Sequence, residues 1–92
     1  MPLREEGGRL IVSGALTIDS VPELVAAGAE IVRAGATVVD LSDAGEVDSA
    51  ALSLVLEWRR TAGDRELRVT GAPAAFDKLA KLYGVADLLP AI

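Results

Sequence analysis

Short apolar runs bounded by glycine alternate along the chain with longer stretches in which apolar residues recur at helical spacing. The run at residues 10–12, Leu-Ile-Val, lies between glycines on both sides and is typical of a buried strand. The β-branched run at residues 37–41 predicts a second strand in the centre of a sheet. Residues 67–71 alternate between apolar and polar side chains, which predicts a half-exposed third strand.

Three helices are predicted, one after each of these strands. The first begins at Ser20, because Ser20 and Glu23 have the spacing of a capping box, and Gly35 ends it. The second is predicted over residues 48–62 and the third over residues 73–84, each followed or ended by a glycine. The apolar stripes are Val21, Leu24, Val25, Gly28, Ile31 and Val32 in the first helix, and Phe76, Leu79, Ala80, Leu82 and Tyr83 in the third.

The order strand, helix, strand, helix, strand, helix with short loops predicts a layered α/β domain with mostly parallel pairing. A length of 92 residues corresponds to one domain over residues 1–92. The chain is 51% hydrophobic and 25% charged, with a mean hydropathy of +0.39, which is enough apolar material for a core.

The charge balance and the missing residue types exclude several classes of function. Nine Lys and Arg against 14 Asp and Glu give a net charge of -5, so the surface repels a phosphate backbone and nucleic acid is not expected as a partner. The sequence has no Cys and no His, which removes most nucleophiles, bases and transition-metal ligands. Its apolar runs are too short to span a membrane and residues 1–6 do not resemble a signal peptide, so we expect a cytoplasmic protein without membrane insertion.

The remaining polar clusters do not point to catalysis. A turn is predicted at residues 42–46, and the carboxylates of Asp43, Glu46 and Asp48 could in principle hold a divalent cation. Their spacing does not match a calcium-binding loop, so we expect no metal, no cofactor and no catalytic residue. The lysines Lys78 and Lys81 are placed on the exposed side of the third helix, away from any serine that they could activate.

The second helix carries more apolar surface than one sheet face requires. Leu52, Val55 and Leu56 share one sector and are expected to face the sheet. The adjacent sector consists of Ala51, Leu54 and Trp58, and we expect this sector to reach the surface. Two interpretations of Trp58 stay open: the indole is a partner contact, as tryptophan often is in interfaces, or it covers the edge of the core.

Ser49 also has two interpretations. It lies at a helix start, where unpaired N–H groups and the helix dipole favour a phosphate group, so it is a possible phosphorylation site. The alternative is that its hydroxyl only caps the helix.

Three segments together resemble one family. They are Val38-Val39-Asp40-Leu41-Ser42, then Val47-Asp48-Ser49-Ala50-Ala51-Leu52, and finally Leu79-Ala80-Lys81-Leu82-Tyr83-Gly84-Val85 with Leu88-Leu89-Pro90. This pattern is similar to STAS domains, the fold of anti-sigma factor antagonists and of the cytoplasmic tails of sulfate transporters. Within the family it is most like the MlaB type, the small STAS subunit of Mla phospholipid ABC transporters.

The resemblance implies a mixed sheet of about four strands with helices on one side, in which the segment around Leu3 supplies an additional strand. It also implies a non-catalytic subunit that binds an MlaF-like transporter ATPase. The complex also contains an MlaE-like permease and an MlaD-like protein. Such a subunit is cytoplasmic, peripheral at the inner membrane, and supports outer-membrane lipid asymmetry. The partner-binding residues that the resemblance and the helix pattern indicate are Asp48, Ser49, Ala50, Ala51, Leu54 and Trp58.

Two other functions are weighed against this one. The first is an anti-sigma factor antagonist, in which a partner kinase phosphorylates Ser49 and so breaks binding to itself. The second is a small stand-alone enzyme, which the absence of His and Cys disfavours.

Overall fold

The computed structural model describes residues 2–91 and contains one four-stranded sheet with the order β1-β2-β3-β4. β1 pairs with β2 antiparallel, whereas β2, β3 and β4 are parallel to one another. This confirms the predicted α/β class with a mixed, mostly parallel sheet, and β1 is the strand expected around Leu3. The elements are β1 (Leu3–Glu6), β2 (Arg9–Leu16), η1 (Val21–Glu23), α1 (Val25–Arg33), β3 (Val38–Val47), α2 (Ser49–Ala62), β4 (Arg68–Thr70), α3 (Ala74–Leu82) and η2 (Ala86–Leu88).

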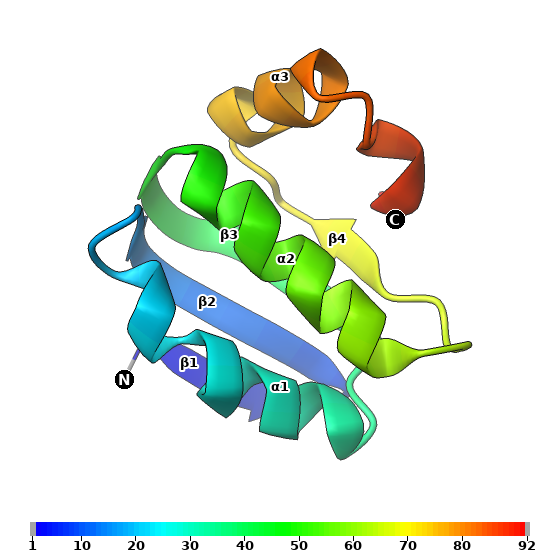
Figure 1. Ribbon diagram of the computed structural model, residues 1–92. Helices are drawn as coiled ribbons and strands as arrows, with labels where there is room; N and C mark the ends of the chain where they lie inside the picture. Colours follow the sequence, from blue (N-terminus) through cyan, green and yellow to red (C-terminus); the bar gives the residue numbers. More distant parts are fainter. Residues whose placement is uncertain (1, 92) are drawn as a thin grey trace.

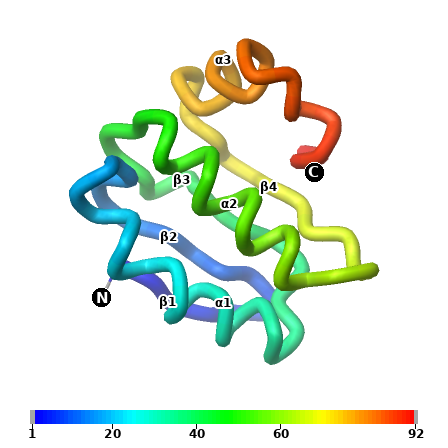
Figure 2. Tube along the Cα trace, viewed as in Figure 1, coloured from blue at the N-terminus to red at the C-terminus, as the bar shows by residue number. Residues whose placement is uncertain are grey.

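The helices form a layer over one face of the sheet (Figure 1). α1 and α2 lie side by side on that face, and α3 lies beyond β4, next to α2. Leu10, Val39 and Val69 are neighbours in the strand register and point into the core beneath the helices. No described helix covers the opposite face, which carries charged residues such as Arg9 and Asp40 (Figure 2). The core is therefore confined to one side of the sheet.

Trp58 joins the two helices of this layer. Its side chain is 0% exposed, and its indole N–H donates a hydrogen bond of 3.1 Å to the carbonyl oxygen of Val25. The ring lies directly on Gly28, where a Cβ atom would overlap it. Of the two interpretations left open by the sequence, the structure therefore supports the core position.

The apolar sectors of α2 differ from the sequence prediction. Ala51 and Leu54 are as buried as Trp58, so the expectation that this sector reaches the surface is wrong. Leu56, which was expected to face the sheet, is only partly buried. The reason is that α2 lies between α1 and α3 above the sheet, and two helices cover the sector that the sequence assigned to a partner.

The first helix does not begin with a capping box. The hydroxyl of Ser20 accepts the N–H of Thr17 at 2.9 Å and donates to the carbonyl of Ala15 at 2.7 Å. It makes no cap hydrogen bond, and α1 begins only at Val25, after the short η1. The hydroxyl is engaged in the loop that precedes the helix, which is why the capping prediction is wrong.

The turn predicted at residues 42–46 is part of β3, which continues to Val47 beside β2. The pairing shifts register between Ile11 and Ser13 and again between Gly14 and Leu16. These irregularities and the exposure of the segment break the alternation that marks a strand, so the sequence pattern indicated a turn.

The stripe predicted for the third helix is only partly correct. Phe76 and Ala80 are buried, but Leu82 is 76% exposed and Tyr83 is 59% exposed. α3 lies at the margin of the helix layer, so the strip through Phe76, Leu79 and Ala80 meets the core, with Leu79 only partly buried. Gly84 ends the helix at a φ of 71°, as predicted.

Substituting Gly28→Ala tests the contact between the two helices. The added methyl group overlaps the Trp58 ring, so we expect a loss of about 1–3 kcal/mol in the free energy of unfolding in urea. An ordinary Gly→Ala change within a helix instead stabilises it by up to about 1 kcal/mol. Ala27→Ser, on the exposed side of α1, is the control and should change little. A more stable Gly28→Ala protein would show that the ring does not lie on Gly28.

Candidate functional site

One end of the molecule is formed by the carboxyl ends of β2 and β3. β3 pairs with β4 only from Val38 to Asp40 and then continues beside β2 to Val47. The loop that follows β2, at residues 17–20, and the start of α2 lie side by side at this end, on the left in Figures 1 and 2. We call residues 17–20 together with residues 48–50 the tip.

Asp48 holds the two parts of the tip together. One carboxylate oxygen, Oδ1, accepts the N–H of Ala50 at 2.8 Å, and the other, Oδ2, accepts the N–H of Ile18 at 3.1 Å. The backbone N–H of Asp48 donates to the carbonyl of Leu16 at 3.2 Å. Asp48 is therefore the N-cap of α2, and it also fixes the loop after β2 against the helix start.

Ser49 is exposed at the first position of α2. Because Asp48 supplies the cap, the interpretation of Ser49 as the capping residue is wrong. Its hydroxyl makes no hydrogen bond within residues 2–91 and lies at the positive end of the helix dipole. The next residue, Ala50, is half-buried and small, so a partner backbone can approach the helix start closely.

The structure brings together only part of the predicted partner-binding set. Asp48, Ser49 and Ala50 share the tip, whereas the side chains of Ala51, Leu54 and Trp58 are enclosed in the core and cannot contact a partner in this conformation. The predicted partner contact is therefore corrected for these last three residues. Their side chains are buried where α2 packs against the sheet and its neighbouring helices.

Sequence reasoning missed Ile18. Its side chain is 72% exposed, beside the start of α2. A single isoleucine after a strand gives no periodic signal, so the sequence does not show that it points outward. Only the hydrogen bond from its N–H to Asp48 places it at the tip.

Asp40, in the Asp-Leu-Ser segment of β3, has a structural role away from the tip. The side chain and N–H of Ser42 donate to its carboxylate, and with the Arg9 guanidinium at 3.4 Å they lower the pKa of Asp40 below its usual value. Its stabilising effect is complete above that usual value and is lost as the pH falls through the native pKa. The segment is further constrained by Gly71, which lies against Ser42 and leaves no room for a Cβ atom.

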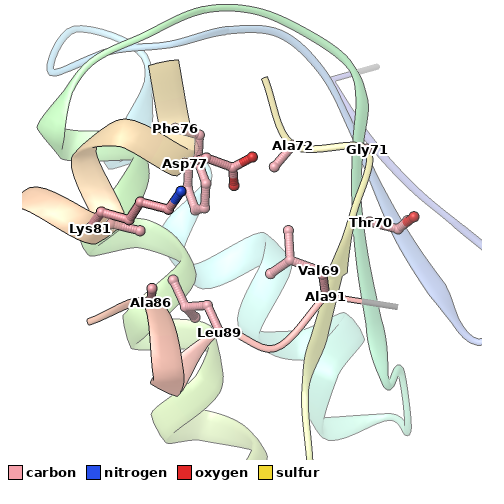
Figure 3. A pocket seen from close by; sticks show the side chains of 11 residues that line it. Val69, Thr70, Gly71, Ala72, Phe76, Asp77, Lys81, Ala86, Leu89 and Ala91 are labelled. Atoms are coloured by element: carbon pink, nitrogen blue, oxygen red, sulfur yellow. The ribbon is translucent and has the colours of Figure 1, made fainter. Parts of the chain in front are cut away.

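A cavity of about 370 Å³ lies between β4, α3 and the segment that returns from η2 to β4 (Figure 3). Asp77 and Lys81 stand at one side of it, and Phe76 and Leu89 supply apolar wall. The hydroxyl-bearing Thr70 points away from the cavity, onto the opposite side of β4. The lining therefore combines a pair of opposite charges with small and apolar side chains.

Asp43, Glu46 and Asp48 do not assemble into a metal site. Within residues 2–91, no three carboxylate, imidazole or thiol groups come close enough to hold a metal ion. In the same part of the chain, no helix is both long and apolar enough to cross a membrane.

Comparisons with known proteins agree with this fold. A family model described as the Mlab STAS domain matches residues 2–90. No curated protein matches the chain in sequence. Among 15 matching chains of solved structures is the anti-sigma factor antagonist SpoIIAA in its unphosphorylated form. It is 16% identical, with a TM-score of 0.64, and the match covers 97% of this chain and 83% of that one. At this identity the similarity concerns the fold alone.

Asp48→Ala tests the double role of this carboxylate. We expect a loss of about 0.5–2 kcal/mol in the free energy of unfolding, because α2 loses its cap. The amide of Ile18 should also exchange its hydrogen faster in NMR experiments, since its acceptor is removed. Asp19→Ala, which removes the neighbouring exposed carboxylate, is the control. Equal stability and equal Ile18 exchange in the two variants would contradict the role of Asp48.

Proposed function

The chain belongs to the MlaB-type family of STAS domains, and from this membership we propose that it is a non-catalytic subunit of a phospholipid ABC transporter. In this proposal it binds the MlaF-like ATPase of an Mla-type complex and supports the assembly and activity of that complex. The lipid pathway itself belongs to the MlaE-like permease and the MlaD-like protein. The subunit is cytoplasmic and reaches the inner membrane only through its partner, where it contributes to outer-membrane lipid asymmetry.

The proposal is supported by the way in which the two segments of the tip are held together. Asp48 fixes the loop after β2 and the first turn of α2 in one arrangement, while Ser49 remains exposed and unpaired within the described chain. A surface that is already ordered loses little conformational freedom on binding, which favours a stable protein–protein contact. Structural residues of the core, Trp58 among them, hold this surface in place without taking part in the contact.

The docking contact follows from the groups that the tip presents. The hydroxyl of Ser49 can donate to a carbonyl group of the ATPase, and Ala50 leaves room for a backbone segment to approach. The shielded carboxylate of Asp48 keeps the helix start rigid during this approach. The proposal therefore assigns partner binding to Asp48, Ser49 and Ala50.

The second candidate is an anti-sigma factor antagonist that is switched by phosphorylation of Ser49. The specific observation in its favour is the exposed hydroxyl at a helix start, where a phosphate group finds N–H donors and a favourable dipole. Mass spectrometry of the protein purified from its native host distinguishes the two functions. A phosphorylated Ser49 together with a co-purifying kinase supports this second function, and an unmodified Ser49 together with an ABC ATPase supports the first.

Ser49→Gln tests the docking surface without changing its charge. The longer side chain obstructs the closest approach at the helix start, so we expect the affinity for the purified MlaF-like ATPase to fall at least about tenfold in calorimetric titration. Thr37→Gln, at the other end of β3, is the matched control and should bind like the unmodified protein. An unchanged affinity of Ser49→Gln would contradict a contact at Ser49.

A further inference from the structure

We infer that Ile18 is the apolar anchor of the tip and that it enters a socket on the partner that is apolar inside and lined by Lys and Arg at its rim. This inference rests on the proposed docking function and specifies the chemistry of the surface that the ATPase must present.

The loop around Ile18 is fixed before any partner binds. The N–H groups of Ser20 and Val21 donate to the carbonyl of Thr17 at 3.0 and 2.9 Å, and the hydroxyl of Ser20 bonds to Thr17 and Ala15. The N–H of Ile18 is held by Asp48 at 3.1 Å. With its backbone held on both sides, Ile18 keeps its 72% exposed side chain pointing outward. A β-branched residue on such a backbone has few rotamers to lose when it is buried.

The charged residues that neighbour Ile18 in the sequence are all acidic. Every charged residue from position 10 to 32 and from position 34 to 58 is an aspartate or a glutamate. At the tip these are Asp19 and Asp48, with Glu46 near the end of β3. None of the three takes part in an ion pair within residues 2–91. The carboxylate of Asp48 is held by two backbone N–H groups, whereas those of Asp19 and Glu46 have no cationic partner in the described residues. An occupant that buries Ile18 must therefore tolerate or neutralise these two carboxylates, which favours a basic rim.

Six of the seven arginines lie at the other end of the molecule. The amino ends of the parallel strands and the carboxyl ends of α1 and α2 meet there, on the right in Figure 1. The residues at this end are Arg9, Arg33, Arg59, Arg60, Arg65 and Arg68. Carboxylates lie among these arginines: Arg9, Arg60 and Arg68 are paired with Asp40, Glu57 and Glu66, and Asp64 and Asp87 lie beside Arg59 and Arg65. This end therefore carries charges of both signs, whereas the charged residues of the tip are acidic.

The acidic character of the tip also decides between kinds of occupant. An anionic membrane surface and a nucleic acid both repel the acidic tip. Two tips of the same chain would bring like charges together around the two isoleucines, so a symmetric contact between copies is disfavoured as well. A protein socket with an apolar floor and basic rim satisfies both the isoleucine and the carboxylates.

Two matched pairs of variants test the inference against the purified MlaF-like ATPase of the same host. Ile18→Ser should weaken binding by at least about tenfold, whereas Leu82→Ser, at a residue of similar exposure on α3, should not. Asp19→Lys should weaken binding about three- to tenfold and reduce its dependence on salt, whereas Asp64→Lys, beside Arg65 at the other end, should leave both unchanged. Circular dichroism spectra should match in all four variants, because each changes an exposed side chain.

The outcomes separate this inference from the function on which it rests. If the unmodified protein does not bind the ATPase, the proposed docking function fails. If it binds and Ile18→Ser or Asp19→Lys binds equally well, docking stands and the anchor in a basic socket is overturned. Sedimentation of the protein alone completes the test: self-association that Ile18→Ser abolishes would identify a second copy as the occupant and would also overturn the inference.

Discussion

The contact between Trp58 and Gly28 is the constraint on which the rest of the structure depends. The indole can lie on α1 only because residue 28 has no side chain, and its N–H is satisfied by the carbonyl of Val25 at 3.1 Å. This contact sets how closely α1 and α2 approach each other above the sheet. Since α2 follows β3 directly and α1 follows β2 through a short loop, their spacing also sets where the loop and the helix start meet at the tip.

The same constraint decides which parts of α2 are available for function. The apolar residues that suggested an interface are buried where the helix packs against the sheet and against the neighbouring helices. What remains for a partner is the polar start of the helix and the loop fixed to it by Asp48. α2 is thus packed along its length, and its first turn is where we propose that a partner binds.

The sequence predicts most of the fold because its strands and helices are separated by glycines that the structure requires. Gly63 and Gly84 end helices at positive φ, as their positions indicate. The predicted elements were wrong where contacts with residues distant in the sequence outweigh the local sequence pattern. The hydroxyl of Ser20 bonds to its loop instead of capping a helix, and residues 42–46 form a strand because β2 lies beside them. For the site, the pattern identified Asp48 and Ser49 at a helix start. It could not place Trp58 inside, because burial depends on a glycine thirty residues earlier, and it could not show that Ile18 faces outward.

We propose that the protein binds its partner through the tip, while the buried apolar residues of α2 serve only the core. Hydrogen–deuterium exchange of the protein, alone and mixed with the purified MlaF-like ATPase that we propose as its partner, tests this most directly. Binding should slow hydrogen exchange at residues 17–20 and 48–50 and leave exchange at the carboxyl ends of α1 and α2 unchanged. Protection centred on the arginine-rich end or on the open face of the sheet, with an unchanged tip, would contradict it.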